Sequence, residues 1–262
     1  MRHAVDTLYT ETHGAGPDVV FVHGWGMHSG VWRDFALVLA RDFRVTLIDL
    51  PGHGRSATIS DFGLPGLARA LSDVAPERAH WVGWSLGAEI ALYLADRYPE
   101  RVSSLAMVAG NARFASSPDW PHAMDAELLE RFATEMMEDH HATLMKFLSL
   151  QTMGLENARA ALKMLRERVE ECDEPAEDAL RAGLDILRSA DLRPHLARLR
   201  RPLLLLMGAR DRLVPPAAGS DMLALAQSAD LHILEGAAHV PFLTHEEECV
   251  NRLAEFWRRH DR

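Results

Sequence analysis

The chain has 262 residues, 48% of them hydrophobic, which is enough to bury a large core in one domain or in one domain with an insert. Its formal net charge of −10 argues against a general nucleic-acid or anionic-membrane surface, because such partners require broad positive potential. The two cysteines, Cys172 and Cys249, form neither a disulfide framework nor a zinc pattern. Residues 1–14 contain no apolar stretch of signal-peptide length, and no segment is apolar over the length of a membrane span. We therefore expect a cytoplasmic protein, and we expect it to be a monomer.

Short apolar runs recur along the chain, mostly separated by helix-like segments. Because these runs are continuous and do not alternate with polar residues, they predict a mostly parallel sheet covered by helices on both faces. The predicted strands are residues 19–22, 45–48, 79–82, 105–108, 203–207 and 231–234.

The pattern changes between Asn111 and about Arg200, where only helical periodicity is found. Apolar residues recur at helical spacing in three groups: Leu128, Phe132 and Met136; Leu144, Phe147 and Leu148; Ala158, Ala161, Leu162, Leu165 and Val169. No low-complexity linker flanks this segment. The sequence predicts a helical cap of residues 111–200 on a core formed by residues 1–110 and 201–262.

A single serine stands between two glycines at residues 83–87, Gly-Trp-Ser-Leu-Gly, where a predicted strand gives way to a predicted helix beginning at Leu86. This pattern is that of the nucleophile elbow, which presents a serine oxygen at a helix N-terminus, where backbone N–H groups favour developing negative charge. Taken alone, such a match is as consistent with an ordinary tight turn. The choice between a nucleophile elbow and a tight turn therefore depends on whether a base and a carboxylate are placed to act with Ser85.

A serine hydroxyl is a poor nucleophile unless a base takes its proton and a carboxylate orients that base. Asp211 follows the strand 203–207 and His239 follows the strand 231–234, so both are expected at the sheet edge that carries Ser85. Asp211 alone could be a turn residue, but its pairing with His239 favours the catalytic interpretation. The order Ser, Asp, His predicts an α/β-hydrolase fold, with an all-helical cap inserted after the sixth strand.

Two backbone donors are needed for the oxyanion of the tetrahedral intermediate. Leu86 directly follows the nucleophile, and Trp25 lies between two glycines in the loop after the strand 19–22. We assign the oxyanion hole to the N–H groups of Trp25 and Leu86. His23 and His53 are expected to brace loops. The fourteen histidines contain no H-E-x-x-H pattern, so no metal site is predicted.

With these residues in place, the chain resembles the pimeloyl-[acyl-carrier protein] methyl ester esterases of biotin synthesis. The segments that carry the resemblance span nearly the whole chain: HGWGM, VWR, DLPGHGRS, GWSLG, FLSLQTMG, GLDILRSADLR, GARDRLVP and AAHVPF. The cap segments are the most specific, because no general catalytic requirement explains them. The chain departs from the family pattern at Ala88, where a second glycine is usual, and at Ala142, where the cap carries less basic charge.

The resemblance implies roles for individual residues. Ser85, Asp211 and His239 would be the nucleophile, the orienting carboxylate and the base. The substrate would contact Trp25, Ser85, Leu86, Phe147, Leu148, Ser149, Leu150, Gln151 and His239, and an acyl-carrier protein would contact Lys146, Arg159 and Lys163.

The activity expected from the residues and the resemblance is that of a serine carboxylesterase. It would hydrolyse the methyl ester of pimeloyl-acyl-carrier protein through an acyl-enzyme, without a cofactor. Two alternatives remain: a carbon–carbon bond or enol-lactone hydrolase of the same fold, and a non-catalytic ligand receptor, since a fold does not fix a function. The acyl chain-length preference, and the choice between a carrier-bound and a free ester, also stay open.

Overall fold

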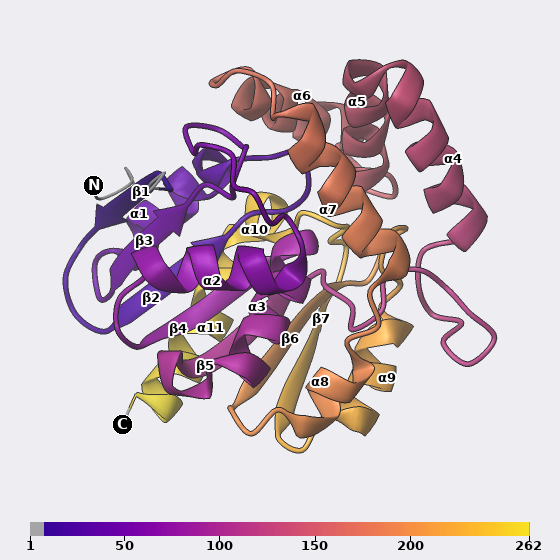
Figure 1. The fold of residues 1–262 in the computed structure, drawn as a ribbon. Coiled ribbons are helices and arrows are strands. Elements are labelled where there is room, and N and C mark those ends of the chain that lie inside the picture. The colour runs from indigo at the N-terminus through magenta and orange to yellow at the C-terminus, as the bar shows by residue number, and fades with distance from the viewer. Residues whose placement is uncertain (1–7, 262) are drawn as a thin grey trace.

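The computed structural model describes residues 8–261 (Figure 1). The N-terminal segment that was predicted to lack a signal peptide lies partly outside the described residues. At the centre is a seven-stranded sheet in the order β1-β3-β2-β4-β5-β6-β7. Its strands are β1 (Thr10–His13), β2 (Asp18–Val22), β3 (Arg44–Ile48), β4 (Ala79–Trp84), β5 (Val102–Val108), β6 (Leu203–Gly208) and β7 (Ala229–Leu234).

All neighbouring strands pair in parallel except β1, which pairs antiparallel with β3, so the prediction of a mostly parallel sheet is confirmed. The six predicted strands are present. Strand β1 was not predicted; its residues Thr-Glu-Thr-His are all polar and are alternately exposed and half-buried. An edge strand of this kind buries too little apolar surface to leave a signal in the sequence.

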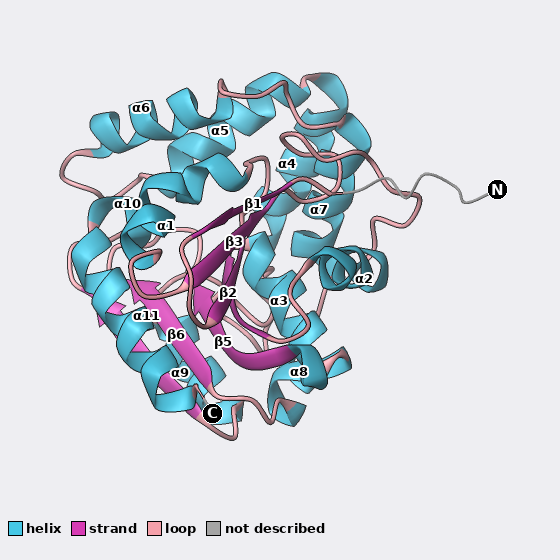
Figure 2. Ribbon diagram, turned by 90° about the vertical axis from the view of Figure 1, so that its left-hand side faces the viewer, coloured by secondary structure: helices cyan, strands magenta, loops and turns pink. Residues whose placement is uncertain are grey.

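Helices cover both faces of the sheet. The core helices are α1 (Arg33–Leu39), α2 (Leu64–Val74), α3 (Leu86–Arg97), α9 (Ala217–Leu225), α10 (Pro241–Thr244) and α11 (Glu246–His260), with short 3₁₀ turns η1 (Ser29–Trp32) and η2 (Pro99–Arg101). Figure 2 shows α1 and α11 on one face of the sheet and α2, α3 and α8 on the other. The central strands are buried on both faces: every residue of β4 and β6 is buried, which explains their continuous apolar sequence.

Five helices lie between β5 and β6: α4 (Ala126–Glu138), α5 (His140–Gln151), α6 (Ala158–Val169), α7 (Glu177–Ser189) and α8 (Arg193–Arg198). Figure 1 shows α4, α5, α6 and α7 together above the sheet, and we call these four helices the cap. Within residues 8–261 the insert follows the fifth strand, and not the sixth as predicted. Among the described residues only one strand, β1, precedes β2. The insert would follow the sixth strand only if two strands preceded β2.

The exact division at residues 110 and 200 stays a prediction. Helix α8, inside the predicted cap range, packs against α3 and α9 of the core. Within residues 8–261, no helix is both long and apolar enough to cross a membrane.

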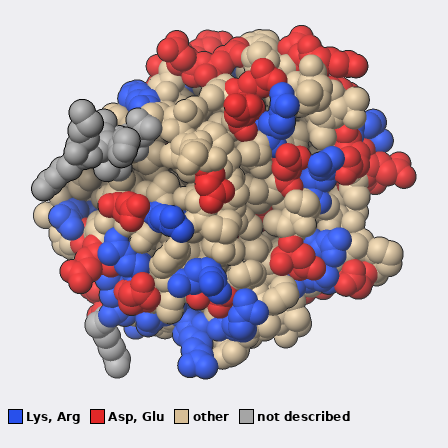
Figure 3. All heavy atoms as spheres, viewed as in Figure 1, with Lys and Arg blue, Asp and Glu red and all other residues tan. Residues whose placement is uncertain are grey.

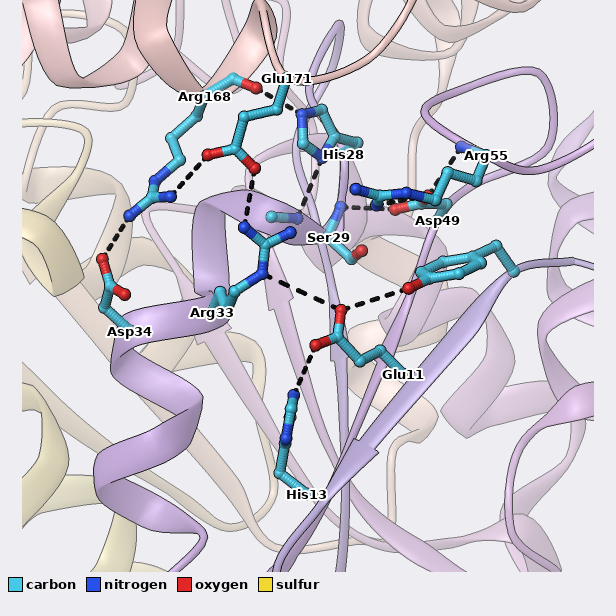
Figure 4. Close-up of polar contacts among 12 residues, drawn as sticks. Glu11, His13, His28, Ser29, Arg33, Asp34, Asp49, Arg55, Arg168 and Glu171 are labelled. Atoms are coloured by element: carbon cyan, nitrogen blue, oxygen red, sulfur yellow. Dashed lines mark hydrogen bonds and ion pairs between the residues drawn. The ribbon is translucent and has the colours of Figure 1, made fainter.

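The end of α6 is tied to the core by ion pairs (Figure 4). Arg33 of α1 donates to Glu171 at 2.8 Å, and Glu171 also accepts from Arg168 at 2.6 Å. Arg168 pairs in addition with Asp34 of α1, while its carbonyl oxygen accepts a hydrogen bond from the His28 ring. Because His28 lies in the loop after β2, these contacts connect the cap to the loop that also carries Trp25.

Candidate active site

Ser85 occupies a sharp corner between β4 and α3, as predicted. Its φ of 54° lies in the left-handed region, which costs energy for any residue with a side chain and is a recurrent feature of functional sites. The flanking glycines permit the corner: a Cβ on Gly83 would lie 2.3 Å from the Gly87 oxygen, and one on Gly87 would lie 2.5 Å from the Val22 oxygen. The unusual Ala88 is accommodated because it faces Gly110, where an added Cβ would lie 2.4 Å from the Ala88 methyl group.

Asp211 and His239 form a buried pair beside this corner. The Nδ1 of His239 lies 2.8 Å from Oδ2 of Asp211, and neither side chain is exposed to solvent. The other oxygen of Asp211, Oδ1, accepts from the N–H groups of Leu213 at 2.8 Å and Val214 at 3.0 Å. Asp211 is therefore held by its own loop while it binds the imidazole.

The main chain of His239 places its ring between the elbow and the cap. Its carbonyl oxygen accepts from the indole Nε1 of Trp84, the residue before Ser85, at 2.8 Å. Its N–H donates to the carbonyl oxygen of Gln151, the last residue of α5, at 3.3 Å. The Nε2 of His239 and the Oγ of Ser85 are both buried without a hydrogen-bond partner among the described residues. In a serine esterase these two atoms hydrogen-bond to each other as nucleophile and base, and in the conformation described no hydrogen bond joins them.

The predicted oxyanion donors flank the elbow. Leu86 is the first residue of α3, a position whose N–H has no partner within the helix. The Gly24–Trp25 peptide is fixed through its carbonyl oxygen, which bonds to the His23 ring at 2.8 Å and accepts from Met27 N–H at 3.2 Å. A Cβ on Gly24 would lie 3.3 Å from the Cβ of Ser85, so this loop packs directly against the nucleophile.

His23 and His53 brace loops, as predicted. The His23 Nε2 accepts from Leu50 N–H at 2.9 Å, so the neutral ring carries its proton on Nδ1 and donates it to Gly24. Complete burial lowers the pKa of His23 to about 3 and that of His53 to about 4. Both rings therefore stay uncharged at neutral pH. Asp49, at the end of β3, accepts from Ser29 N–H at 2.6 Å and completes the bracing.

The predicted acyl-chain residues lie on α5. Phe147, Leu148 and Gln151 are buried, while Ser149 and Leu150 are half-buried. The Phe147 ring packs edge-on against Trp25, with ring centroids 4.9 Å apart, and against Phe132 at 5.7 Å. The structure thus brings Phe147 to the loop that carries Trp25. The Ser149 hydroxyl is used within the helix, where it donates to the Met145 oxygen at 2.9 Å.

Two features close to the elbow were not predicted from the sequence. One is the indole of Trp25, which donates from Nε1 to the carbonyl oxygen of Leu180 on α7 at 2.7 Å. The other is Glu89 on α3, which is completely buried and whose carboxyl group is approached only by the backbone N–H of Phe114 among the described residues, too loosely for a regular hydrogen bond. Burial raises the pKa of Glu89 well above its usual value. In the sequence, the only signal for the Trp25 contact was Gly183 inside α7, and the only signal for Glu89 was its charge among the apolar residues of α3.

The three predicted carrier contacts lie on the cap surface, apart from the elbow. Lys146 pairs with Glu135 at 2.7 Å, and Lys163 approaches Glu167 at 3.6 Å, so acidic neighbours partly offset both charges. Arg159 is exposed on α6, the helix that carries Lys163. On the face seen in Figure 3, acidic side chains dominate the upper edge, over the cap. Any basic surface is therefore local.

Comparison with known proteins extends over nearly the whole chain. Residues 19–252 match the alpha/beta hydrolase family. A pimeloyl-[acyl-carrier protein] methyl ester esterase from Methylococcus capsulatus is 45% identical over 249 residues, 95% of this chain and 98% of that protein. A protein of the same name from Pectobacterium atrosepticum is 40% identical over 250 residues, again 95% and 98% of the two chains.

Solved structures agree on the fold. An esterase from Exiguobacterium antarcticum superposes with a TM-score of 0.85 at 19% identity, over 95% of this chain and 94% of that one. An enol-lactonase from Burkholderia xenovorans gives a TM-score of 0.81 at 22% identity, over 95% of both chains. Structural similarity at such low identity supports the fold alone, whereas the sequence relatives are specific. The chain belongs to the alpha/beta hydrolase family and, within it, to the pimeloyl-[acyl-carrier protein] methyl ester esterases.

Proposed function

We propose that this enzyme hydrolyses the methyl ester of pimeloyl-acyl-carrier protein, releasing methanol and the free pimeloyl carboxylate for biotin synthesis. The observation that carries the proposal is the strained Ser85 elbow beside a buried His239–Asp211 pair. The names of the sequence relatives supply the substrate. We expect the enzyme to act as a cytoplasmic monomer, and the proposed reaction uses only groups of the chain and water.

In the first half of the reaction, His239 takes the proton of Ser85 through Nε2 while the serine oxygen attacks the ester carbonyl. The carbonyl oxygen becomes an oxyanion, which the N–H groups of Trp25 and Leu86 stabilise. Collapse of this intermediate breaks the bond to methoxide, which receives the proton from His239 and leaves as methanol. The pimeloyl group is now esterified to Ser85.

In the second half, His239 takes a proton from water, which attacks the acyl-enzyme. The Ser85 oxygen leaves, recovers the proton, and the carboxylate product is free. Asp211 stabilises the imidazolium that forms in both halves and holds its Nδ1 proton in place, which leaves Nε2 free to act as the base. Phe147 and its neighbours on α5 form the apolar wall beside which the acyl chain lies.

The nucleophile assignment is tested by Ser85→Ala, with Ser189→Ala as a matched control on the cap surface. Ser85→Ala should lower kcat for a short p-nitrophenyl ester by about 10³- to 10⁶-fold, because nucleophile and base act as one unit. A fluorophosphonate should label Ser85 in the parent enzyme. Near-normal turnover by Ser85→Ala would exclude the mechanism, and an unlabelled, inactive parent would favour a non-catalytic receptor.

The carrier protein is proposed to dock on α6, where Arg159, Lys163 and Arg166 stand at positions i, i+4 and i+7. Acyl-carrier proteins are acidic, and this chain has a net charge of −10, so association requires local positive charge. Lys163 is 77% exposed and available for such a contact. The competing interpretation is an ordinary solvated helix face with mixed charges.

The docking proposal is tested by the double variant Arg159→Glu with Lys163→Glu. It should lower kcat/KM for a pimeloyl-carrier methyl ester by about 10-fold or more, and added salt should shrink the loss because exposed charges are screened over about 10 Å at 0.1 M. Turnover of small p-nitrophenyl esters should not change. The matched control is Arg97→Glu with Arg200→Glu, two exposed residues of the core. An equal loss in that control would show that the change in net charge, and not the position of the residues, lowers kcat/KM. Unchanged carrier turnover in the α6 variant would contradict docking there.

A further inference from the structure

A glycine lies in the middle of α7, where a helix former would be expected. Gly183 is buried and is flanked by good helix formers in the segment Glu177–Ser189. Glycine inside a helix is unfavourable because it loses more backbone entropy than alanine on folding. The space around Gly183 supplies a reason for this choice, because two side chains of the core fill the place of its Cβ.

Those two side chains belong to the two residues that we assign as oxyanion donors. A Cβ on Gly183 would lie 2.7 Å from Cδ1 of Trp25 and 3.0 Å from Cδ2 of Leu86. One turn earlier on α7, the Leu180 carbonyl oxygen accepts the indole N–H of Trp25 at 2.7 Å. The Phe147 ring of α5 also packs edge-on against the indole. The side chain of Trp25 is thus held by α7 and α5.

The same loop is attached to the cap a second time. The His28 ring accepts from Gly30 N–H at 3.0 Å through Nδ1, so its proton is on Nε2, which donates to the Arg168 carbonyl oxygen at the end of α6 (Figure 4). The loop from Trp25 to His28 is therefore bound to cap carbonyls at both ends.

We propose that Gly183 and the Leu180 carbonyl are positioning groups of the oxyanion hole, acting through the side chains of Trp25 and Leu86. The inference rests on the proposed esterase function. It adds that the contact of the cap helix α7 with Trp25 and Leu86 sets the geometry of both donors. A donor N–H stabilises an oxyanion only within a narrow range of distance, so a shift of a few tenths of an ångström matters. The inference also accounts for the family resemblance in the segment that begins at Gly183, which the triad and the acyl-chain wall do not explain.

The test is Gly183→Ala, which adds one methyl group against the two donors. The matched control is Gly219→Ala on α9, where the added Cβ would lie 2.7 Å from Leu231 and 3.0 Å from Met207, the same crowding away from the elbow. Activity is measured with a short p-nitrophenyl ester and divided by the number of sites that a fluorophosphonate titrates. This normalisation removes the effect of any unfolded fraction.

We expect Gly183→Ala to lower kcat per titrated site by about 10-fold, with KM changed by less than about two-fold, since misplaced donors weaken the transition state more than substrate binding. The affinity for a boronic acid, whose tetrahedral adduct puts an oxygen in the oxyanion hole, should fall by the same factor as kcat/KM. Gly219→Ala should keep both values. A merely structural role for Gly183 predicts fewer titrated sites with normal turnover per site.

The route through Trp25 is tested in a Trp25→Phe background, which removes the indole N–H and with it the hydrogen bond that fixes the ring at Leu180, so that the smaller ring can move away from an added methyl group. There Gly183→Ala should cost less than about three-fold, because coupled residues are not additive. The inference is overturned if Gly183→Ala turns over at the parental rate per site, if Gly219→Ala loses as much, or if the loss persists in full without the indole. Failure of the esterase proposal looks different, since the parent enzyme would then not be labelled at Ser85.

Discussion

Replacing Asp211 by asparagine should disable the base without disturbing the fold. The structure fixes how the new amide would sit, because Oδ1 of Asp211 accepts two backbone N–H groups, from Leu213 and Val214. Only an oxygen can accept them, so the amide oxygen must take that place and the amide NH₂ must face His239. An NH₂ group facing Nδ1 requires Nδ1 to be an acceptor, which moves the imidazole proton to Nε2.

A histidine protonated on Nε2 cannot take the proton of Ser85 through that atom. The same substitution in the serine protease triad lowers kcat by about 10⁴-fold for this reason, and we expect a loss of about 10³- to 10⁴-fold here. Stability should change little, since both backbone hydrogen bonds and the side-chain volume are retained. The assay is kcat for a short p-nitrophenyl ester, together with a thermal melt of the same preparation.

The two measurements separate the explanations. A large loss of kcat at an unchanged melting temperature supports the tautomer argument. A fall in kcat of less than about 10-fold would refute it, because the wrong tautomer has no other source of Nε2 basicity. A large loss with a lower melting temperature would show instead that the loop itself had moved. Ser189→Ala, on the cap surface, provides the baseline.

Two further changes test other parts of the structure. Phe147→Ala should lower kcat/KM for medium-chain esters by about 1–3 kcal/mol more than for acetyl esters, because it removes part of an apolar wall; equal losses for both chain lengths would make Phe147 purely structural. Glu89→Gln should raise the melting temperature more at about pH 8 than at about pH 5. Burial raises the folded-state pKa of Glu89 above its unfolded value, so the parent protein loses stability as the pH rises between the two pKa values, by about 1.4 kcal/mol per pH unit. The glutamine variant has no such loss. Thermal melts of parent and variant at both pH values measure this difference, and a gain that does not grow with pH would contradict it.

The sequence predicted most of what depends on local pattern. The elbow at Ser85, the loops of Asp211 and His239, and the six predicted strands each have a signal within a few residues, and all lie where they were expected. Strand β1 left no such signal because it buries no apolar face. The contact between the Trp25 side chain and Gly183 joins residues far apart in the chain, so no sequence spacing could predict it. Glu89 stands as one charged residue among the apolar residues of α3, and its complete burial follows only from the packing around that helix.

The closure of the elbow has a kinetic consequence. Only 2% of Ser85 is exposed and its Oγ is sealed from solvent, while the N–H of His239 is bonded to the end of α5. An ester must enter, methanol must leave, water must arrive and the acid must depart, and none of these exchanges can take place in the conformation described. Each catalytic cycle therefore includes opening events that carry no bond making or breaking. If these are slower than the chemistry, esters with good and poor leaving groups will turn over at similar rates, and solvent viscosity will control the maximum velocity.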